Sequence, residues 1–177
     1  MSLVLLALVL TTQAASADPS GEAAKPRISV QSSDVPSLRV QYLNIPWGPN
    51  TFSAMESPGD SFYNRRPWPF AQLAAEAPFS LDGTAVPAGR YALVFHPNSP
   101  DDKGMSLEVR RVAADFLEAG NVMAPAPEGE AVLRVPVRFE TVTDSAPALR
   151  IDLRPSPEGA SLAIAYGTRR LVKELRR

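Results

Sequence analysis

The sequence of 177 residues contains no cysteine and a single histidine, His96. Without cysteine the chain cannot form a disulfide, use a thiol nucleophile or build a cysteine zinc site, and one imidazole excludes a multi-histidine metal site. We therefore expect a protein that uses neither a metal ion nor another cofactor.

An excess of charge of one sign is also missing. The 18 Lys and Arg residues nearly balance the 19 Asp and Glu residues, which gives a formal net charge of -1. A balanced chain has no overall field that would attract nucleic acid or an anionic membrane. We expect no nucleic-acid partner.

Only one long apolar run occurs, at residues 3–10, which read LVLLALVL. This run is far short of the roughly 20 residues that span a bilayer, so we expect no membrane span. It is followed by Ala15-Ser16-Ala17, which has the small-x-small pattern of a signal-peptidase site. A buried N-terminal strand is the alternative interpretation of the run.

The domain organisation follows from this interpretation. We predict a signal peptide over residues 1–17, a flexible polar leader over residues 18–25 and a single domain over residues 26–177. After cleavage near Ala17 the protein would be secreted or periplasmic.

The remainder of the chain has the pattern of an all-β domain. Its 18 prolines disfavour a helical bundle, since proline interrupts helix interiors. Apolar and polar residues alternate in several segments, as half-buried strands require. Strands are predicted at residues 38–43, 77–81, 90–95, 105–109, 132–139, 149–153 and 161–166. We predict an antiparallel β-sandwich or flattened barrel of about seven to nine strands, with at most one short helix.

Glycine and proline refine this prediction. Asp82-Gly83 and the Pro-Ala-Gly sequence at residues 87–89 are typical of tight turns between strands. Gly89 precedes the nearly continuous apolar run at residues 90–95, which we predict to be a central strand covered on both faces. We expect valine at Gly89 to disrupt the fold more than valine at Gly159, which lies in a longer connection. Pro136 places its own strand at a sheet edge or bulge, because proline lacks the donor that a central strand needs.

Two segments are ambiguous. Residues 73–76 are alanine-rich, which favours a helix, but their apolar residues alternate, and we favour a strand. Apolar residues near helical spacing ahead of Gly120 predict a short helix or a turn at about residues 113–119.

One motif resembles a known family. Residues 83–93 read GTAVPAGRYAL and are similar to the Gly-x-x-Leu-Pro-Ala-Gly-x-Tyr-Ala-Leu motif of the domain of unknown function 2911 family. Residues 162–171 resemble the closing strand pair of that family, with Tyr166 where tryptophan is usual, and residues 40–47 resemble its early strand. The family's Trp-Arg-x-Gly-Ala-Asn-Glu segment is absent, and residues 63–69 stand in its place. The resemblance implies a secreted β-sandwich with no assigned activity.

Candidate binding residues are concentrated in one proline-rich segment, residues 63–70, which read YNRRPWPF. Rigid aromatic rings stack on sugar or peptide faces, and neighbouring guanidinium groups bind carboxylate or phosphate oxygens. We predict a surface for a glycan, a peptide or another envelope component, formed by Trp47, Tyr63, Arg65, Arg66 and Trp68. In the alternative interpretation the two tryptophans plug the open ends of the sandwich and the arginines are solvated.

His96 completes the set of candidate ligand-binding residues, at the end of the predicted central strand. Its ordinary pKa lies near neutrality, so it is also a candidate general base that would need a carboxylate from another strand. A structural histidine at a strand end is the competing interpretation. Acidic residues such as Glu108, Asp115, Glu118 and Glu128 occur further along the chain, but their sequence spacing does not show which carboxylates lie close together.

The sequence therefore predicts a secreted or periplasmic, non-catalytic binding or structural module of unknown ligand. The alternative is a metal-independent hydrolase that acts on an envelope or extracellular polymer.

Overall fold

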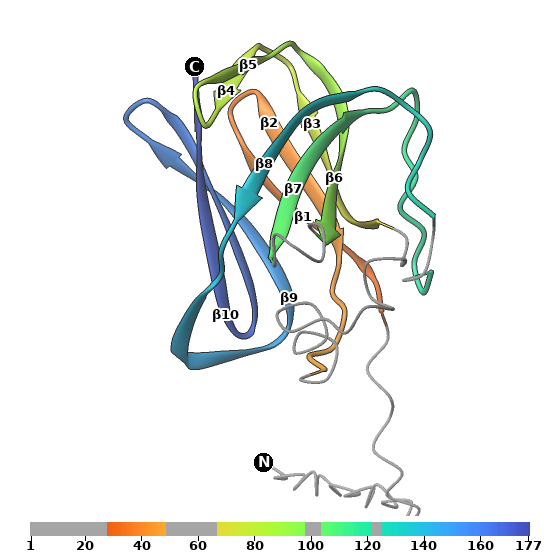
Figure 1. The fold of residues 1–177 in the computed structure, drawn as a ribbon, viewed down its shortest axis with the longest axis vertical. Coiled ribbons are helices and arrows are strands. Elements are labelled where there is room, and N and C mark those ends of the chain that lie inside the picture. The colour runs from red at the N-terminus through yellow and green to blue at the C-terminus, as the bar shows by residue number, and fades with distance from the viewer. Residues whose placement is uncertain (1–27, 49–66, 98–103, 122–124) are drawn as a thin grey trace, which may run out of the picture.

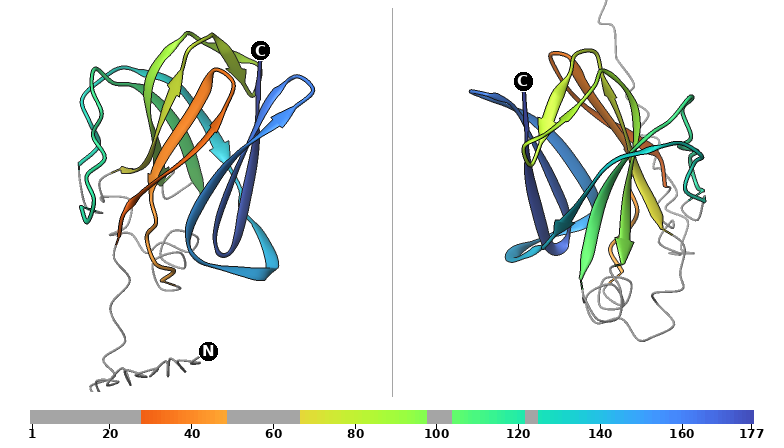
Figure 2. Two further views of the ribbon diagram at one scale, coloured as in Figure 1. Left: turned by 180° about the vertical axis from the view of Figure 1, so that it is seen from behind. Right: turned by 45° about the horizontal axis from the view of Figure 1, so that its top comes forward.

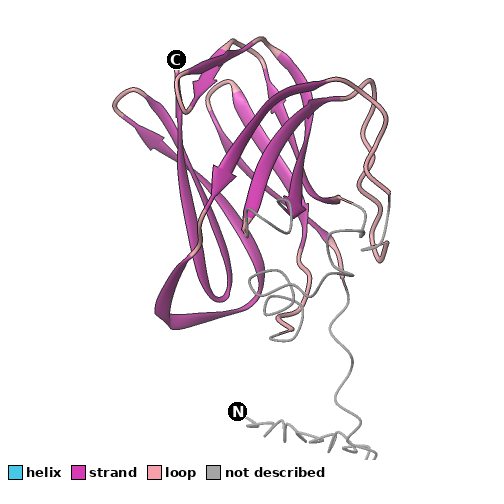
Figure 3. Cartoon of the chain, in the orientation of Figure 1, coloured by secondary structure: helices cyan, strands magenta, loops and turns pink. Residues whose placement is uncertain are grey.

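The computed structural model describes residues 28–48, 67–97, 104–121 and 125–177. These residues form ten strands and no helix (Figures 1 and 3). The all-β prediction is confirmed.

The strands belong to two antiparallel sheets. The first contains β1 (Val30–Val35), β2 (Leu38–Leu43), β3 (Trp68–Ala75), β6 (Gly89–Pro97), β7 (Met105–Arg111) and β8 (Ala131–Val137). The second contains β4 (Phe79–Leu81), β5 (Thr84–Val86), β9 (Glu140–Ser156) and β10 (Gly159–Arg176).

The sheets have the strand orders β1-β2-β3-β6-β7-β8 and β5-β4-β10-β9. They face each other as two layers, which Figure 2 shows from two further directions. The architecture is a β-sandwich and not a closed barrel. The described part of the chain contains no helix of the length and apolarity needed to cross a membrane.

The central strand β6 is buried on both faces, as predicted. Tyr91, Leu93 and Phe95 point into the sandwich and join its main core, where the ring of Phe95 stacks on that of Phe70 at a centroid distance of 4.0 Å. The alternate residues point to the opposite face of the six-stranded sheet, which we call the outer face. Burial on both faces explains why this run is continuously apolar.

The connection between β7 and β8 covers part of the outer face. Phe116 and Ala126 pack against a small apolar cluster formed by Ala92, Val94 and Val112. The described parts of this connection, residues 112–121 and 125–130, are called the cover. A helix or a turn was predicted at residues 113–119. The helix is not present; the segment has bends at residues 113–114 and a turn at residues 119–120.

Polar side chains hold the cover in place. The side-chain amide of Gln72 on β3 donates to Oδ1 of Asp115 at 2.6 Å and accepts from the backbone N–H of Phe116 at 3.1 Å. Arg90 forms an ion pair with the same carboxylate at 2.6 Å. Buried Gln72 is therefore satisfied by the segment that covers it.

Several local predictions are confirmed. Asp82 and Gly83 both have positive φ, 49° and 82°, in the turn that joins β4 to β5. Pro136 lies on β8, an edge strand of the six-stranded sheet. Residues 73–75 belong to β3 and are strand. Sequence analysis did not predict β1 and β5 as separate strands.

The strand β10 doubles back on itself, as its lower end in Figure 1 shows. Its pairing with β9 shifts register twice between Ala165 and Arg169, around Gly167, which has a φ of 57°. Beyond this bend the chain returns beside its own start, where Arg177 N–H donates to the carbonyl of Glu158 at 2.8 Å.

The reversal corrects the expectation for the two glycines. A Cβ on Gly159 would overlap the backbone carbonyl oxygen of Leu175, which the strand pairing holds in place. A Cβ on Gly89 would meet the side chain of Tyr91, 3.2 Å from its hydroxyl oxygen. The packing therefore requires glycine more strictly at Gly159 than at Gly89.

Candidate functional site

The predicted site residues fall into three groups. Trp47 and Trp68 lie at one end of the sandwich, and His96 lies on the outer face of the six-stranded sheet. Tyr63, Arg65 and Arg66 lie outside the described residues.

Both tryptophans lie at the same end because β2 and β3 are antiparallel. Trp68 begins β3, and Trp47 follows the end of β2, so each lies where its strand meets that end of the sheet. Both residues are half-buried and pack against the main core. This end of the sandwich is therefore lined with aromatic rings that keep part of their surface exposed.

Trp47 connects the two sheets. Its backbone N–H donates to the carbonyl of Pro147 at 2.8 Å, and its ring meets that of Tyr166 edge-on at 4.8 Å. The ring lies directly over Gly167, where a Cβ would overlap it. Burial raises the pKa of Tyr166, and its protonated hydroxyl donates to the carbonyl of Pro46 at 2.9 Å. Trp47 is thus held from three sides.

Among the described residues, the ring of Trp68 contacts rings of the six-stranded sheet. It pairs with Phe95 across the β3–β6 ladder, and its ring lies 6.1 Å from that of Phe95 and 6.0 Å from that of Phe70. These contacts fix the ring without burying it fully.

His96 faces away from the tryptophans. It follows Phe95 on β6, so its side chain points to the outer face while Phe95 and Trp68 point inward. The structure therefore separates His96 from the aromatic surface with which sequence analysis grouped it.

On the outer face His96 meets Glu108 of the neighbouring strand β7. Nε2 of His96 lies 3.0 Å from Oε2 of Glu108, and the two side chains are 10% and 4% exposed. Although the distance is short, buried Nε2 has no hydrogen-bond partner of acceptable geometry among the described residues. The other carboxylate oxygen, Oε1, accepts from Nε of Arg110 at 2.7 Å.

The surroundings of His96 favour its neutral form. Burial lowers the pKa of His96, and the positive charges of Arg134 and Arg110 lower it further, while Glu108 acts in the opposite direction. Burial and the guanidinium groups prevail, so the imidazole is neutral at neutral pH.

A histidine paired with a carboxylate can act as a general base, but only if the proton to be removed can reach it. Here the imidazole and the carboxylate are both buried between strands, and Arg110 occupies the second carboxylate oxygen. The geometry is that of a buried polar cluster. Among the described residues no group of three or more histidine and acidic side chains could hold a metal ion.

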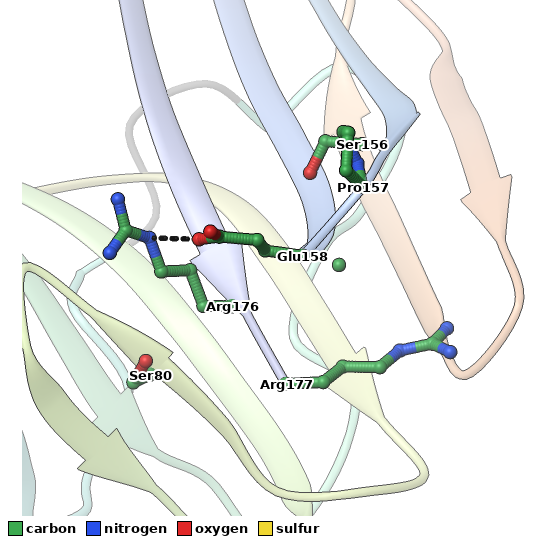
Figure 4. A pocket seen from close by; sticks show the side chains of 7 residues that line it. Ser80, Ser156, Pro157, Glu158, Arg176 and Arg177 are labelled. Atoms are coloured by element: carbon green, nitrogen blue, oxygen red, sulfur yellow. Dashed lines mark ion pairs between the residues drawn. The ribbon is translucent and has the colours of Figure 1, made fainter.

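A separate hollow of about 510 Å³ lies at the far end of the four-stranded sheet (Figure 4). Glu158 and Arg176 line it and form an ion pair at 3.0 Å with side chains that are 67% and 63% exposed. None of the described candidate residues from the sequence lines this hollow. The ion pair of Glu158 and Arg176 is solvated, and Arg177, which also lines the hollow, donates to the carbonyl of Pro36 at 2.6 Å.

The partners of His96 were missed by sequence analysis. Glu108 was one of several carboxylates in the chain, and Arg110 and Arg134 had no visible role. Glu108 and Arg110 share a face of β7 because they are two residues apart, and Arg134 pairs with Glu108 across the β7–β8 ladder. Only the strand register brings His96 to them.

No protein-family model, curated protein or solved structure matches the chain. The resemblance of residues 83–93 to the domain of unknown function 2911 family stays a prediction.

Proposed function

We propose that this protein is a non-catalytic binding module and that its ligand surface is the end of the sandwich that contains Trp47 and Trp68. The observation that carries the proposal is that both rings are held rigidly and only half-buried at the same end. Rings fixed before binding lose little conformational entropy when a ligand stacks on them.

The ligand class follows from the aromatic surface. Half-exposed tryptophan rings suit the apolar faces of sugars and of extended peptides. With the signal peptide expected at residues 1–17, we propose that the protein is secreted or periplasmic and binds a glycan, a peptide or another envelope component. We also propose that Tyr63, Arg65 and Arg66, which adjoin Trp68 in sequence, contribute to the same surface.

Binding of soluble glycans and peptidoglycan fragments, measured by calorimetry, tests this proposal. Trp68→Ala is expected to weaken binding about 30-fold, which corresponds to the roughly 2 kcal/mol of a tryptophan anchor. Val172→Ala is the matched control, because Val172 is apolar, 49% exposed and lies on the part of β10 that runs from the bend at Gly167 toward the pairing of Leu175 with Leu81. Urea unfolding of each variant separates lost binding from lost folding.

Two results would contradict the proposal. One is that the wild-type protein binds none of the fragments. The other is that folded Trp68→Ala binds as tightly as the wild-type protein.

One observation bears on the alternative, a metal-independent hydrolase acting on an envelope or extracellular polymer. His96 lies 3.0 Å from a carboxylate oxygen on another strand, as that function requires, but the pair is buried. A general base contributes about 10²–10⁴-fold to a rate, so His96→Gln would abolish measurable turnover if the alternative held. Turnover of the same fragments that disappears in His96→Gln and persists in Trp68→Ala would favour the hydrolase.

A further inference from the structure

The polar cluster on the outer face contains His96, the single histidine of the chain. Histidine is the side chain whose ordinary pKa lies between pH 5 and 8. His96 is nine-tenths buried there, with Nε2 close to Glu108 but without a hydrogen-bond partner among the described residues. A buried donor or acceptor without a partner is costly and is retained only where the surrounding structure imposes it.

Charged groups face His96 mainly from β7 and β8. Glu108 and Arg110 come from β7, and Arg134 comes from β8, where it pairs with Glu108 in the strand register. On the other side, β3 contributes the apolar Pro69 opposite Val94. Adding a proton to His96 would therefore place a buried positive charge close to the guanidinium groups of Arg110 and Arg134, while Glu108 is already paired with Arg110.

The acidic groups of the cover do not offset that charge. Asp115 is already bound by Gln72 and Arg90. Glu118, Glu128 and Glu130 are exposed, so water screens their charges. Glu108 is thus the one buried carboxylate available to His96 among the described residues.

The cluster is connected to the cover through Arg110. While Nε of Arg110 binds Glu108, its Nη1 reaches the carbonyl of Pro127 at 3.4 Å. The next residue, Arg111, donates its backbone N–H to the carbonyl of Glu130 at 2.8 Å. If the Glu108 carboxylate pairs with protonated His96, its ion pair with Arg110 weakens. Arg110 is also the side chain that reaches the cover, so its contact with Pro127 changes as well.

We propose that His96 is an acid-sensitive latch, whose protonation releases the cover from the outer face while the core of the sandwich stays folded. Opening the cover exposes the apolar cluster of Ala92 and Val94 and separates Arg110 from the carbonyl of Pro127. This proposal is independent of the ligand surface proposed at the end of the sandwich that contains Trp47 and Trp68.

The direction of the pH dependence follows from the histidine. Because its pKa in the folded protein lies below the ordinary value of 6.5, the neutral imidazole stabilises the closed cover fully above pH 6.5. That stability is lost as the pH falls from 6.5 toward the folded-state pKa. If His96 has its ordinary pKa of 6.5 when the cover is open, protonation at pH 5 can shift the equilibrium toward the open cover by at most about 30-fold.

Hydrogen exchange followed by NMR between pH 7 and pH 5 tests the latch on the full chain. The reporters in the cover are the amides of Val112, bonded to Arg90, and Phe116, bonded to Gln72. After correction for intrinsic exchange, their protection should be lower at pH 5 than at pH 7, by at most about 30-fold. Protection of Leu93, in the centre of β6, should stay unchanged.

Two variants separate the histidine from other acid effects. His96→Gln removes the only imidazole and should make the protection of Val112 and Phe116 independent of pH in this range. Glu118→Gln removes an exposed carboxylate of the cover and should behave as the wild-type protein does. If His96→Gln loses protection in parallel with the wild-type protein, or if Leu93 loses protection together with the cover, the latch is refuted.

A measurement on the wild-type protein covers the case in which His96→Gln does not fold. The single histidine gives one set of ring signals, whose titration midpoint should lie below 6.5, and the protection of Phe116 should fall between pH 6.5 and that midpoint. A midpoint at or above 6.5 would overturn the proposal.

Discussion

Gly167 is the position at which one added methyl group is expected to disturb the aromatic end of the sandwich most directly. In Gly167→Ala the new Cβ would overlap the ring of Trp47, which lies over the glycine. Since the β9–β10 pairing constrains the backbone on one side, the ring is the part that must move. We expect the ring to leave its position against Tyr166.

The size of the effect can be worked out from what the ring loses. A positive φ at alanine costs about 1–2 kcal/mol by itself. Exposing about 100 Å² of the Trp47 ring costs about 2.5 kcal/mol at 25 cal/mol per Å². Loss of the edge-on contact with Tyr166 adds about 0.5–1.5 kcal/mol. We expect Gly167→Ala to lower the free energy of unfolding by about 3 kcal/mol more than backbone strain alone.

Gly83→Ala is the matched control for strain. Gly83 also has a positive φ, 82°, but no atom lies within 4 Å of where its Cβ would be. Urea unfolding followed by circular dichroism gives both free energies, and tryptophan fluorescence should shift to the red only in Gly167→Ala.

A double-mutant cycle tests the mechanism. In a Trp47→Ala background Gly167→Ala should cost only its backbone strain, which leaves a coupling energy of about 3 kcal/mol between the two positions. Equal costs for Gly167→Ala and Gly83→Ala, or strictly additive costs in the cycle, would refute the reasoning.

Three further predictions concern stability and are checked by urea unfolding. Gly159→Ala should cost at least about 2 kcal/mol more than Gly83→Ala, because its Cβ meets a backbone carbonyl and not open space; equal midpoints would contradict the doubling back of β10. Glu108→Ala should cost about 3–5 kcal/mol, because it leaves Arg110 without its buried partner, whereas exposed Glu118→Ala should stay within about 0.5 kcal/mol. Tyr91→Phe should cost about 1 kcal/mol through loss of the 2.5 Å hydrogen bond to the turn before β6, and no change would show that this bond is worth nothing net.

The central strand and its turns were predictable because their signals are local. The apolar run at residues 90–95 requires burial on both faces wherever it lies in the chain, and the structure places it at β6. Asp82-Gly83 accepts the positive φ of a tight turn in any hairpin. Pro136 cannot donate to a ladder, so it belongs at an edge, and β8 is one.

The errors arose where tertiary contacts override local preference. Helical spacing near residues 113–119 is real, but Gln72 binds the side chain of Asp115 and the backbone of Phe116 and holds this segment against the sheet. Gly159 looked replaceable because the connection before it is long. Its importance comes from Leu175, which the reversal of β10 brings beside it.

Of the candidate site, the sequence indicated the types of residue and not their grouping. Trp47 and Trp68 lie at the same end because β2 and β3 are antiparallel, so that the end of β2 lies beside the start of β3. His96 was grouped with them but points to the other face, since adjacent residues of a strand point in opposite directions.

The sequence by itself determined that this protein is an all-β chain without disulfides, with one strand buried on both faces and a proline-marked edge. These properties follow from residue type and from the two-residue period of a strand. Only the tertiary structure decided that His96 meets Glu108, because that contact depends on the register between β6 and β7, which no local pattern specifies. The same register brings Arg110 and Arg134 to the pair, and their charges, together with burial, hold the lone histidine neutral.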